Sequence, residues 1–292
     1  MAVVKQVTSL VELLKDLDEN GMDGYERYRA VNGYLSMEAR YTNTPLNGTF
    51  ELTPFCNFDC KMCYVHLTAN QIKPDERLLT VDEWKSIIDQ AIEHGMIYAD
   101  ITGGECLSYP GFKEVYHHLI ASGVQPAILT NGSLLTEEMV DFLSENPPSV
   151  IQITLYGSCE DAYEKVCGHR AFHEVMDGIE RAKNAGLRVN LTVTPNRYMQ
   201  DDVDALLSLL HSLNISYYIG GSTLPARQET GRKMEEFAVK PNVYFSMLKK
   251  ERAYWETQPR NDEQQGRERV YVPQKKRCLK VYHAAEGTVH FM

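Results

Sequence analysis

The sequence predicts an α/β fold built on a parallel sheet, and two observations lead to this prediction. Strand-like and helix-like segments alternate along most of the chain, as in the βα units that form parallel sheets. Several strand-like segments are nearly continuous apolar runs, which is typical of strands covered on both faces. Six such strands in alternation with helices favour an open (β/α)6 barrel.

The elements follow one another in order. Strands are expected at Thr49–Leu52, Ile97–Thr102, Ala127–Thr130, Val150–Leu155, Arg188–Val193 and Ser216–Ile219. Helices, with apolar residues at helical spacing, are expected at Val81–Glu93, Phe112–Ser122, Glu137–Leu143, Phe172–Ala185 and Val203–Leu213. Thr80 with Glu83 has the pattern of a capping box, and Thr136 that of an N-cap. Glycines stand where three of these helices should end, at Gly95, Gly123 and Gly186.

The length of 292 residues allows one large α/β domain with appendages, and 43% apolar residues can build a sizeable core. Residues 1–45 are expected to form a helical lead-in. The barrel is expected to occupy residues 46–225. Residues 226–292 are expected to hold a linker and a short C-terminal extension.

Composition excludes some classes of partner. The formal net charge is −10 and no long basic stretch is present, which argues against nucleic-acid binding. No run of eighteen apolar residues is present, so the sequence predicts no membrane span. The N-terminus is amphipathic and acidic, unlike a signal peptide. Closely spaced cysteines in such a chain fit a reducing compartment, so we expect a cytoplasmic protein.

Three cysteines, Cys56, Cys60 and Cys63, follow the first expected strand with the spacing C-x3-C-x2-C, and their run holds no fourth. A structural metal site usually has four protein ligands, and an ordinary [4Fe–4S] cluster takes four cysteine thiolates. Three thiolates on a four-iron cube would leave one iron open to a ligand from outside the protein. An open metal position of this kind is typical of catalysis.

Two other interpretations of these cysteines remain. Their spacing would also place them on one face of a buried helix, where no metal is needed, although Pro54 and Asn57 suit a loop better. A zinc site completed by a distant cysteine or histidine is the second, because zinc ligands are often two to four residues apart.

The cysteine run resembles that of the radical SAM superfamily, in which such a loop holds a [4Fe–4S] cluster. A second resemblance is the segment Gly103-Gly104-Glu105, which is similar to the family's "GGE" motif at the end of the second strand. The two glycines remove side chains, so that a ligand can lie on the backbone. The resemblance implies that this edge and Glu105 take the ammonium group of S-adenosylmethionine (SAM).

Further segments continue the resemblance in order. The run Thr130-Asn131-Gly132 resembles the family's third-strand end, and Thr154 falls where a hydroxyl group meets the methionine part of SAM. The stretch from Tyr163 to Gly168 resembles one seen in the peptide-modifying branch, and Arg170 just after it is a candidate to hold the SAM carboxylate. Tyr64 is a candidate to pack beside the cluster or the adenine.

The resemblance implies a partial TIM-like barrel and a mechanism. The cluster passes an electron to the sulfonium of SAM, and the resulting 5′-deoxyadenosyl radical takes a hydrogen atom from the substrate. Peptide-modifying relatives often carry a C-terminal domain, called SPASM or twitch, that binds auxiliary clusters. Here Cys278 and Gly287 match the start of that pattern, but Met292 stands where the next cysteine is expected. An incomplete domain of this type is therefore expected.

The leading hypothesis is a radical SAM enzyme that matures a peptide, by crosslinking or epimerisation, with a low-potential electron donor. A second enzymatic hypothesis is a maturase that oxidises a cysteine or serine on a partner enzyme. A third is an inactive barrel that binds a cluster or a peptide without cleaving SAM, and a fourth is a zinc-stabilised scaffold.

Overall fold

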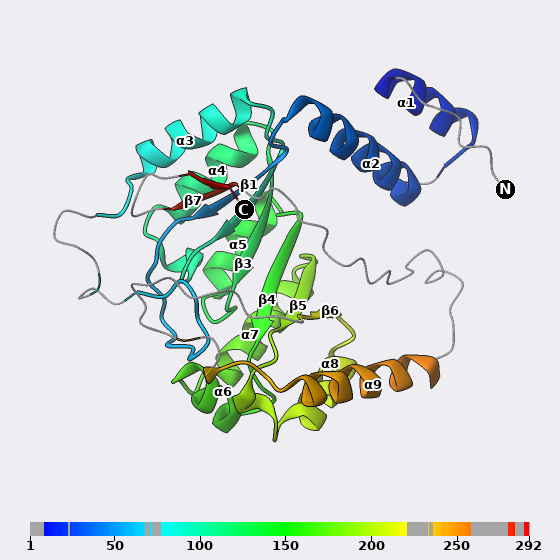
Figure 1. The fold of residues 1–292 in the computed structure, drawn as a ribbon. Coiled ribbons are helices and arrows are strands. Elements are labelled where there is room, and N and C mark those ends of the chain that lie inside the picture. The colour runs from blue at the N-terminus through cyan, green and yellow to red at the C-terminus, as the bar shows by residue number, and fades with distance from the viewer. Residues whose placement is uncertain are drawn as a thin grey trace.

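The computed structural model describes residues 9–22, 24–67, 71, 77–220, 233, 236–257, 280–283 and 289–291. Its centre is a curved sheet with the strand order β6-β5-β4-β3-β2-β1-β7-β8 (Figure 1). Strands β1 to β6 are parallel, β7 is parallel to β1, and β8 is antiparallel to β7. The predicted fold class, a partial (β/α)6 barrel with a helical lead-in and a short extension, is confirmed.

The strands of the described residues are β1 (Asn47–Glu51), β2 (Tyr98–Thr102), β3 (Gln125–Thr130), β4 (Val150–Leu155), β5 (Val189–Val193), β6 (Ser216–Ile219), β7 (Lys280–His283) and β8 (Val289–Phe291). The helices are α1 (Leu10–Glu19), α2 (Gly24–Thr42), α3 (Val81–Glu93), α4 (Phe112–Ala121), α5 (Glu137–Glu145), α6 (Glu160–Cys167), α7 (Phe172–Asn184), α8 (Val203–Leu213) and α9 (Pro241–Thr257). Two short 3-10 helices are η2 (Cys106–Ser108) and η3 (Arg197–Met199).

The predicted helix ends are present. Thr80 and Glu83 form both hydrogen bonds of a capping box, and the Thr136 hydroxyl accepts from the backbone N–H of Met139. Three glycines follow the ends of α3, α4 and α7 in the left-handed region, with φ of 100° for Gly95, 77° for Gly123 and 76° for Gly186.

A helix and a hairpin differ from the prediction. Helix α6 was not among the expected helices, yet it spans eight residues and is capped by Gly168, which has a φ of 71°. The hairpin β7–β8 extends the sheet beyond β1, which the alternating pattern of the barrel did not predict. Cys278, Gly287 and Met292 lie outside the described residues.

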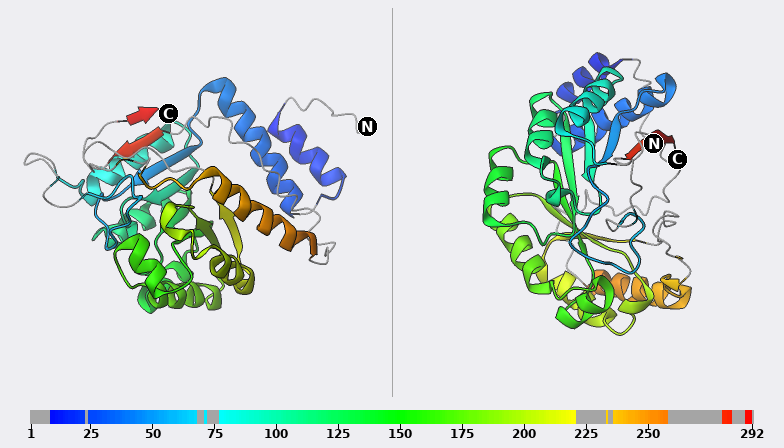
Figure 2. Two further views of the ribbon diagram at one scale, coloured as in Figure 1. Left: turned by 60° about the horizontal axis from the view of Figure 1, so that its bottom comes forward. Right: turned by 90° about the vertical axis from the view of Figure 1, so that its left-hand side faces the viewer.

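Helices α3, α4, α5 and α7 lie along the outer, convex face of the curved sheet, whereas α1 and α2 stand away from it (Figure 1 and Figure 2). Residues on that face of the strands are apolar and buried, including Phe50, Ile101, Ile128, Ile153 and Leu191. Phe50 packs edge-to-face on Trp84 of α3, with ring centroids 6.1 Å apart. Burial of this face fixes which side chains of each strand point to the opposite, concave face.

Helix α9 is fastened to the barrel by a buried carboxylate. The Glu251 side chain is 12% exposed, and its Oε2 lies 3.0 Å from Nε2 of His211 on α8. Its Oε1 accepts hydrogen bonds from the Tyr217 hydroxyl on β6 and from Trp255 Nε1. Charge-assisted hydrogen bonds of this kind hold the segment after the barrel against β6 and α8.

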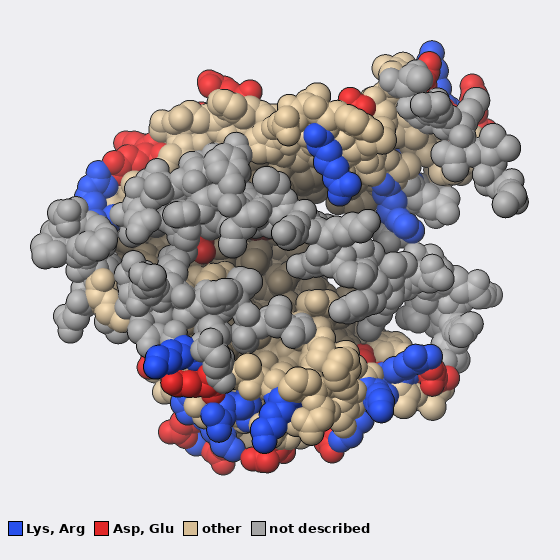
Figure 3. All heavy atoms as spheres, viewed as in Figure 1, with Lys and Arg blue, Asp and Glu red and all other residues tan. Residues whose placement is uncertain are grey.

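Charges of both signs are interspersed over the lower part of the molecule in Figure 3, around α6 and α9. Among the described residues, no helix combines the length and apolar character needed to cross a bilayer.

Candidate active site

A cavity of about 280 Å³ lies at the carboxyl ends of the strands, where ligands bind in parallel α/β sheets. Its walls come from the loop after β1 and from the ends of β2, β3, β4 and β5. Eight residues predicted from the sequence line it together: Cys56, Cys60, Cys63, Tyr64, Gly103, Gly104, Asn131 and Thr154. Two predicted residues, Glu105 and Arg170, are not among the lining residues.

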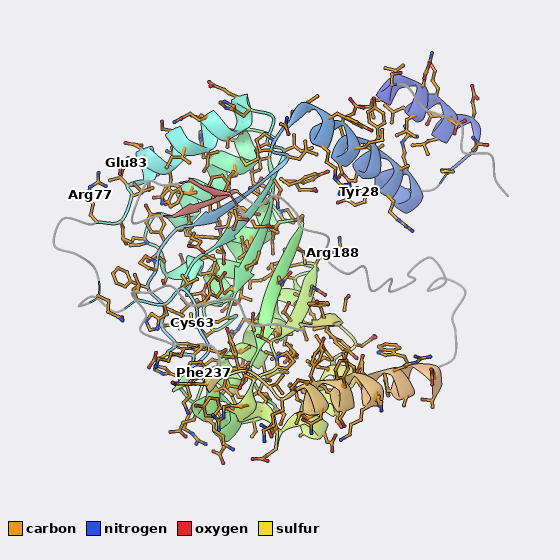
Figure 4. All side chains as sticks on the ribbon, in the orientation of Figure 1. Tyr28, Cys63, Arg77, Glu83, Arg188 and Phe237 are labelled. Carbon is orange, nitrogen blue, oxygen red and sulfur yellow. The ribbon has the colours of Figure 1, made fainter. Side chains whose placement is uncertain are left out.

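The loop that carries the three cysteines is tied to α6. The backbone N–H of Asp59 donates to the carbonyl of Cys167 at 2.9 Å, and that of Lys61 donates to the carbonyl of Val166 at 3.0 Å. These bonds satisfy carbonyl groups in the last turn of α6, which have no partner within the helix. Helix α6 therefore supports the cysteine loop, and Cys63 lies on this loop (Figure 4).

The thiol groups differ in exposure. Cys60 is buried, whereas Cys56 and Cys63 are half-buried. Burial raises the pKa of the Cys56 thiol to about 12, so without a bound metal ion this thiol is protonated at neutral pH. Its sulfur accepts a hydrogen bond from the backbone N–H of Phe58 at 3.4 Å, and the Cys63 sulfur accepts one from His66 at 3.2 Å. Metal binding at these thiols would release protons.

Gly103 and Gly104 are required by the packing of β2 against the cysteine loop. A Cβ atom at Gly104 would lie 2.2 Å from the carbonyl oxygen of Phe55, and one at Gly103 would lie 2.5 Å from that of Thr53. The backbone N–H of Gly104 donates to Thr53 at 2.7 Å, and that of Glu105 donates to Phe55 at 2.8 Å. The sequence predicted these glycines for a ligand on the backbone; they also let two protein segments approach closely.

Glu105 points into the protein beside η2 and is 1% exposed. Its Oε1 accepts from Leu107 N at 3.0 Å and from the Thr130 hydroxyl at 2.8 Å, and its Oε2 accepts from Asn131 N at 2.8 Å. Burial raises the pKa of this carboxyl group, although these hydrogen bonds oppose the shift. The Glu105 carboxylate thus holds the end of β3 in place, although it does not itself line the cavity.

Asn131 continues this network to the cysteine loop. Its Nδ2 donates to Asn57 Oδ1 at 2.8 Å and lies 3.7 Å from the sulfur of Cys56. Its Oδ1 accepts from the backbone N–H of Ser133 at 2.9 Å, and Asn57 Nδ2 in turn donates to the Ser133 hydroxyl at 2.8 Å. The three strand-end motifs are therefore joined by one chain of hydrogen bonds, from Glu105 through Asn131 to the cysteine loop.

The sequence interpretation missed several residues of the site. Asn57 could have been found, because it follows Cys56 directly inside the cysteine run. Gln152 also lines the cavity and lies two residues before Thr154 on β4, so strand alternation alone points it to the same face. Tyr156 also lines the cavity, just after the end of β4, and lies two residues after Thr154, so the same alternation would have pointed to it.

The family model that describes the radical SAM superfamily matches residues 50–210, which are more than half of the chain. The chain belongs to the radical SAM superfamily. The sporulation killing factor maturation protein SkfB of Bacillus subtilis (strain 168) is 27% identical over 196 residues, which are 66% of this chain and 45% of SkfB. The AdoMet-dependent heme synthase of Methanosarcina barkeri (strain Fusaro / DSM 804) is 27% identical over 208 residues, 71% of this chain and 58% of that enzyme.

The radical SAM fold agrees with a solved structure. Streptococcus suis SuiB bound to S-adenosylmethionine superposes with a TM-score of 0.52 at 14% identity, over 70% of this chain and 49% of SuiB. The chain spans about half the length of the curated relatives it matches. The sequence-based predictions of the family, of an iron–sulfur enzyme class and of the cofactor pair are confirmed by these matches.

The cavity suits the cofactors of radical SAM enzymes, a [4Fe–4S] cluster and SAM. Among the described residues, no three His, Cys, Asp or Glu side chains converge on a point that would hold a single metal ion. A four-iron cube binds each thiolate through a different iron, so its ligands surround a volume instead. Three thiols around one cavity, next to a glycine edge without side chains, match that requirement.

Arg170 lies away from the cavity. Its guanidinium is paired with Asp161 at 2.7 Å and with Glu164 at 2.9 Å, and its side chain is 54% exposed. Both partners belong to α6, the helix that the sequence interpretation did not predict. Because α6 ends at Gly168 and the chain reverses there, Arg170 folds back onto the outer surface of this helix. The structure therefore does not bring Arg170 to the candidate SAM site.

Proposed function

We propose that this protein is a radical SAM enzyme that abstracts a hydrogen atom from a peptide during the maturation of that peptide. The observation that carries the proposal is the cavity at the strand ends, in which Cys56, Cys60 and Cys63 meet a glycine edge. These three cysteines would hold three irons of a [4Fe–4S] cluster, and the fourth iron would bind SAM.

The cofactor pair, when bound, would supply the electron-transfer and radical chemistry. Held by Cys56, Cys60, Cys63 and the glycine edge, the pair would supply one-electron reductive cleavage of the C5′–S bond of SAM, with methionine released, and transfer of one hydrogen atom from a substrate carbon to C5′, which would leave the substrate as a carbon radical for the later bond change. The protein binds and orients the reactants and excludes competing reactions.

Four residues around the cavity would contact SAM. The backbone at Gly103 and Gly104 presents polar groups to the cavity, and these are available to the ammonium group. Thr154 offers a hydroxyl from β4, and Tyr64 offers an aromatic ring from the cysteine loop. Glu105 would act on SAM only indirectly, because its carboxylate oxygens already accept hydrogen bonds from Asn131 N, Leu107 N and the Thr130 hydroxyl.

The peptide substrate is supported by the relatives. SkfB is a maturation protein for a killing factor, and SuiB has been crystallised bound to its precursor peptide SuiA. The proposed outcome of the reaction is either a crosslink within the peptide or an epimerised residue. The electron donor and the cytoplasmic location stay predictions.

The test is the formation of 5′-deoxyadenosine by the anaerobically reconstituted full chain with dithionite and SAM, with iron counted in the same sample. We expect about four irons per chain, as for one cluster, together with product. Cys56→Ala, Cys60→Ala and Cys63→Ala should each abolish product and most of the bound iron. Cys159→Ala is the matched control, because Cys159 is exposed and lies outside the cavity.

The outcomes separate the competing hypotheses. Iron without product would favour an inactive barrel that only binds a cluster. Zinc in place of iron would overturn the proposal in favour of a scaffold. Product that persists in Cys56→Ala would contradict the assigned ligands. A maturase acting on a partner enzyme would cleave SAM as well, but its substrate would be a folded protein with a cysteine or serine to oxidise.

A further inference from the structure

The concave face of the sheet is polar over much of β2, β4 and β5, whereas β3 contributes the apolar residues Ala127 and Leu129 to it. Side chains on this face alternate with the buried apolar residues of the outer face, and they include Asp100, Thr102, Gln152, Thr154, Asn190 and Thr192. All six remain half-buried rather than buried. The interior of a closed βα barrel is normally packed with branched apolar side chains. The polar part of this face, on β2, β4 and β5, therefore suits contact with a polar ligand.

Two neighbouring strands carry the densest part of this surface. The register of β4 and β5 places Gln152 beside Asn190 and Thr154 beside Thr192. Gln152 and Thr154 line the cavity of the candidate active site, so Asn190 and Thr192 continue the same surface next to it. We call Gln152, Asn190 and Thr192 the β4–β5 polar floor.

The hydrogen-bonding groups of this floor are not used within the described part of the chain. The Thr192 hydroxyl is buried and has no hydrogen-bond partner among the described residues. Within the same residues, the side-chain amides of Gln152 and Asn190 form no hydrogen bond either. Buried polar groups in folded proteins are almost always paired, so the unpaired Thr192 hydroxyl next to a cavity indicates a ligand that pairs with it. The half-buried amides of Gln152 and Asn190 are available to the same ligand.

The charge of the surface restricts the ligand. The described residues that line the cavity include no lysine, arginine or histidine. Arg188 is exposed at the start of β5, at the opposite end of the strands from Cys63 (Figure 4). A tetrapyrrole, whose propionate groups need cations, finds none among the described lining residues, although one relative is a heme synthase. A peptide fits better, because each of its units carries one donor and one acceptor.

Resting on the proposed function, we propose that the β4–β5 polar floor binds the substrate as an uncharged peptide segment with small hydroxyl, amide or glycine residues. Gln152, Asn190 and Thr192 hydrogen-bond this segment and hold it beside the SAM site. Neutral side-chain amides and hydroxyls can both donate and accept, so they match a peptide backbone in an extended conformation. Acidic or large apolar segments leave these groups unpaired and are disfavoured.

The experiment is a selection from a library of random twelve-residue peptides, each linked to its own mRNA, on the immobilised full chain loaded with cluster and SAM. The recovered sequences should be enriched in Ser, Thr, Asn, Gln and Gly, and depleted of Asp, Glu and large apolar residues. Coproporphyrin III, added as the tetrapyrrole probe, should not displace the selected peptides.

Single substitutions test whether Gln152 and Thr192 bind the selected peptides. Loss of one neutral hydrogen bond should raise the Kd of a selected peptide roughly 2- to 10-fold in Gln152→Leu and in Thr192→Val. Gln125→Leu is the matched control, because Gln125 is exposed at the start of β3, and its Kd should match that of the unmodified protein. Melting temperatures of all three variants show whether each one folds.

Several outcomes overturn the inference: enrichment in acidic or large apolar residues, displacement of peptides by coproporphyrin III, no recovered class at all, or equal Kd values in folded variants. Failure of the proposed function is recognised separately. If the unmodified protein forms no 5′-deoxyadenosine from SAM, the proposed function fails, while the peptide preference is still decided by binding. If SAM is cleaved and no preference is found, only the polar floor is refuted.

Discussion

Replacing Glu105 with glutamine separates two roles for the last residue of the Gly103-Gly104-Glu105 motif. The substitution keeps the size of the side chain but removes one of its two acceptor oxygens. If the glutamine oxygen keeps the bonds from Leu107 and Thr130, its NH2 group faces the backbone N–H of Asn131. A buried donor then loses its acceptor in a side chain that is 1% exposed.

The magnitude follows from this geometry. An unsatisfied buried donor costs about 1–3 kcal/mol. Burial raises the pKa of the Glu105 carboxyl group, so removing its charge returns part of that cost. We expect a net loss of about 1–2 kcal/mol in the free energy of unfolding, which lowers the melting temperature by roughly 2–8 °C. The same change should loosen Asn131 and reduce the amount of iron that the cysteine loop retains.

The assay is urea unfolding of the metal-free chain, followed by iron content and the KM for SAM of the reconstituted chain. Glu138→Gln is the control, because Glu138 forms a solvent-exposed ion pair with Lys113 and its loss should leave stability almost unchanged. Unchanged stability of the metal-free Glu105→Gln protein, together with a hundredfold higher KM for SAM in the reconstituted variant, would refute the reasoning. Glu105 would then act by direct contact with the ammonium group.

Three further predictions concern other parts of the structure. Gly104→Ala places a methyl group 2.2 Å from a loop carbonyl oxygen and should lower iron incorporation severalfold, whereas Gly33→Ala, with open space around it, should not. The pKa of Glu83 is lowered to about 2 from 4.5, first by its hydrogen bond from Arg77 (Figure 4). Its stabilising contribution is therefore complete above pH 4.5 and is lost as the pH falls towards 2. Urea midpoints between pH 6 and 3 should fall less in Glu83→Gln, and parallel curves would contradict this. Glu251→Ala removes the acceptor that fastens α9, so amide exchange in α9 should quicken by about tenfold or more, and unchanged exchange would contradict it.

Most of the barrel could be predicted because its signals are local. Hydrophobic period, caps and helix-ending glycines lie within each element, and strands β4 and β6 begin and end at the predicted residues. The cavity residues could also be predicted, since parallel strands bring their carboxyl ends to one edge. The pairing of β7 with β1 joins segments more than two hundred residues apart, and nothing in either segment specifies the other.

Side-chain direction was the part that sequence could not supply. Arg170 was placed at the SAM site because its position in the chain resembled that of a family arginine. Its direction is set by Asp161 and Glu164 on α6 and by the turn at Gly168. Similarly, two of the partners of Glu105 lie at the end of the next strand, 25 and 26 residues further along the chain. Only a structure shows that a strand-end carboxylate can turn away from the cavity.

The hydrogen bonds between the motifs change how each motif should be understood. Glu105 holds Asn131, Asn131 holds Asn57, and Asn57 follows the first cysteine of the run. The glycines before Glu105 pack directly on the backbone of the same loop. Each strand-end motif thus shapes the loop that presents the thiols. Since buried networks of this kind respond as a unit, the loss of one member should disturb residues that it does not touch. A reduced activity in a variant of any one motif therefore does not by itself show that the altered residue contacts SAM.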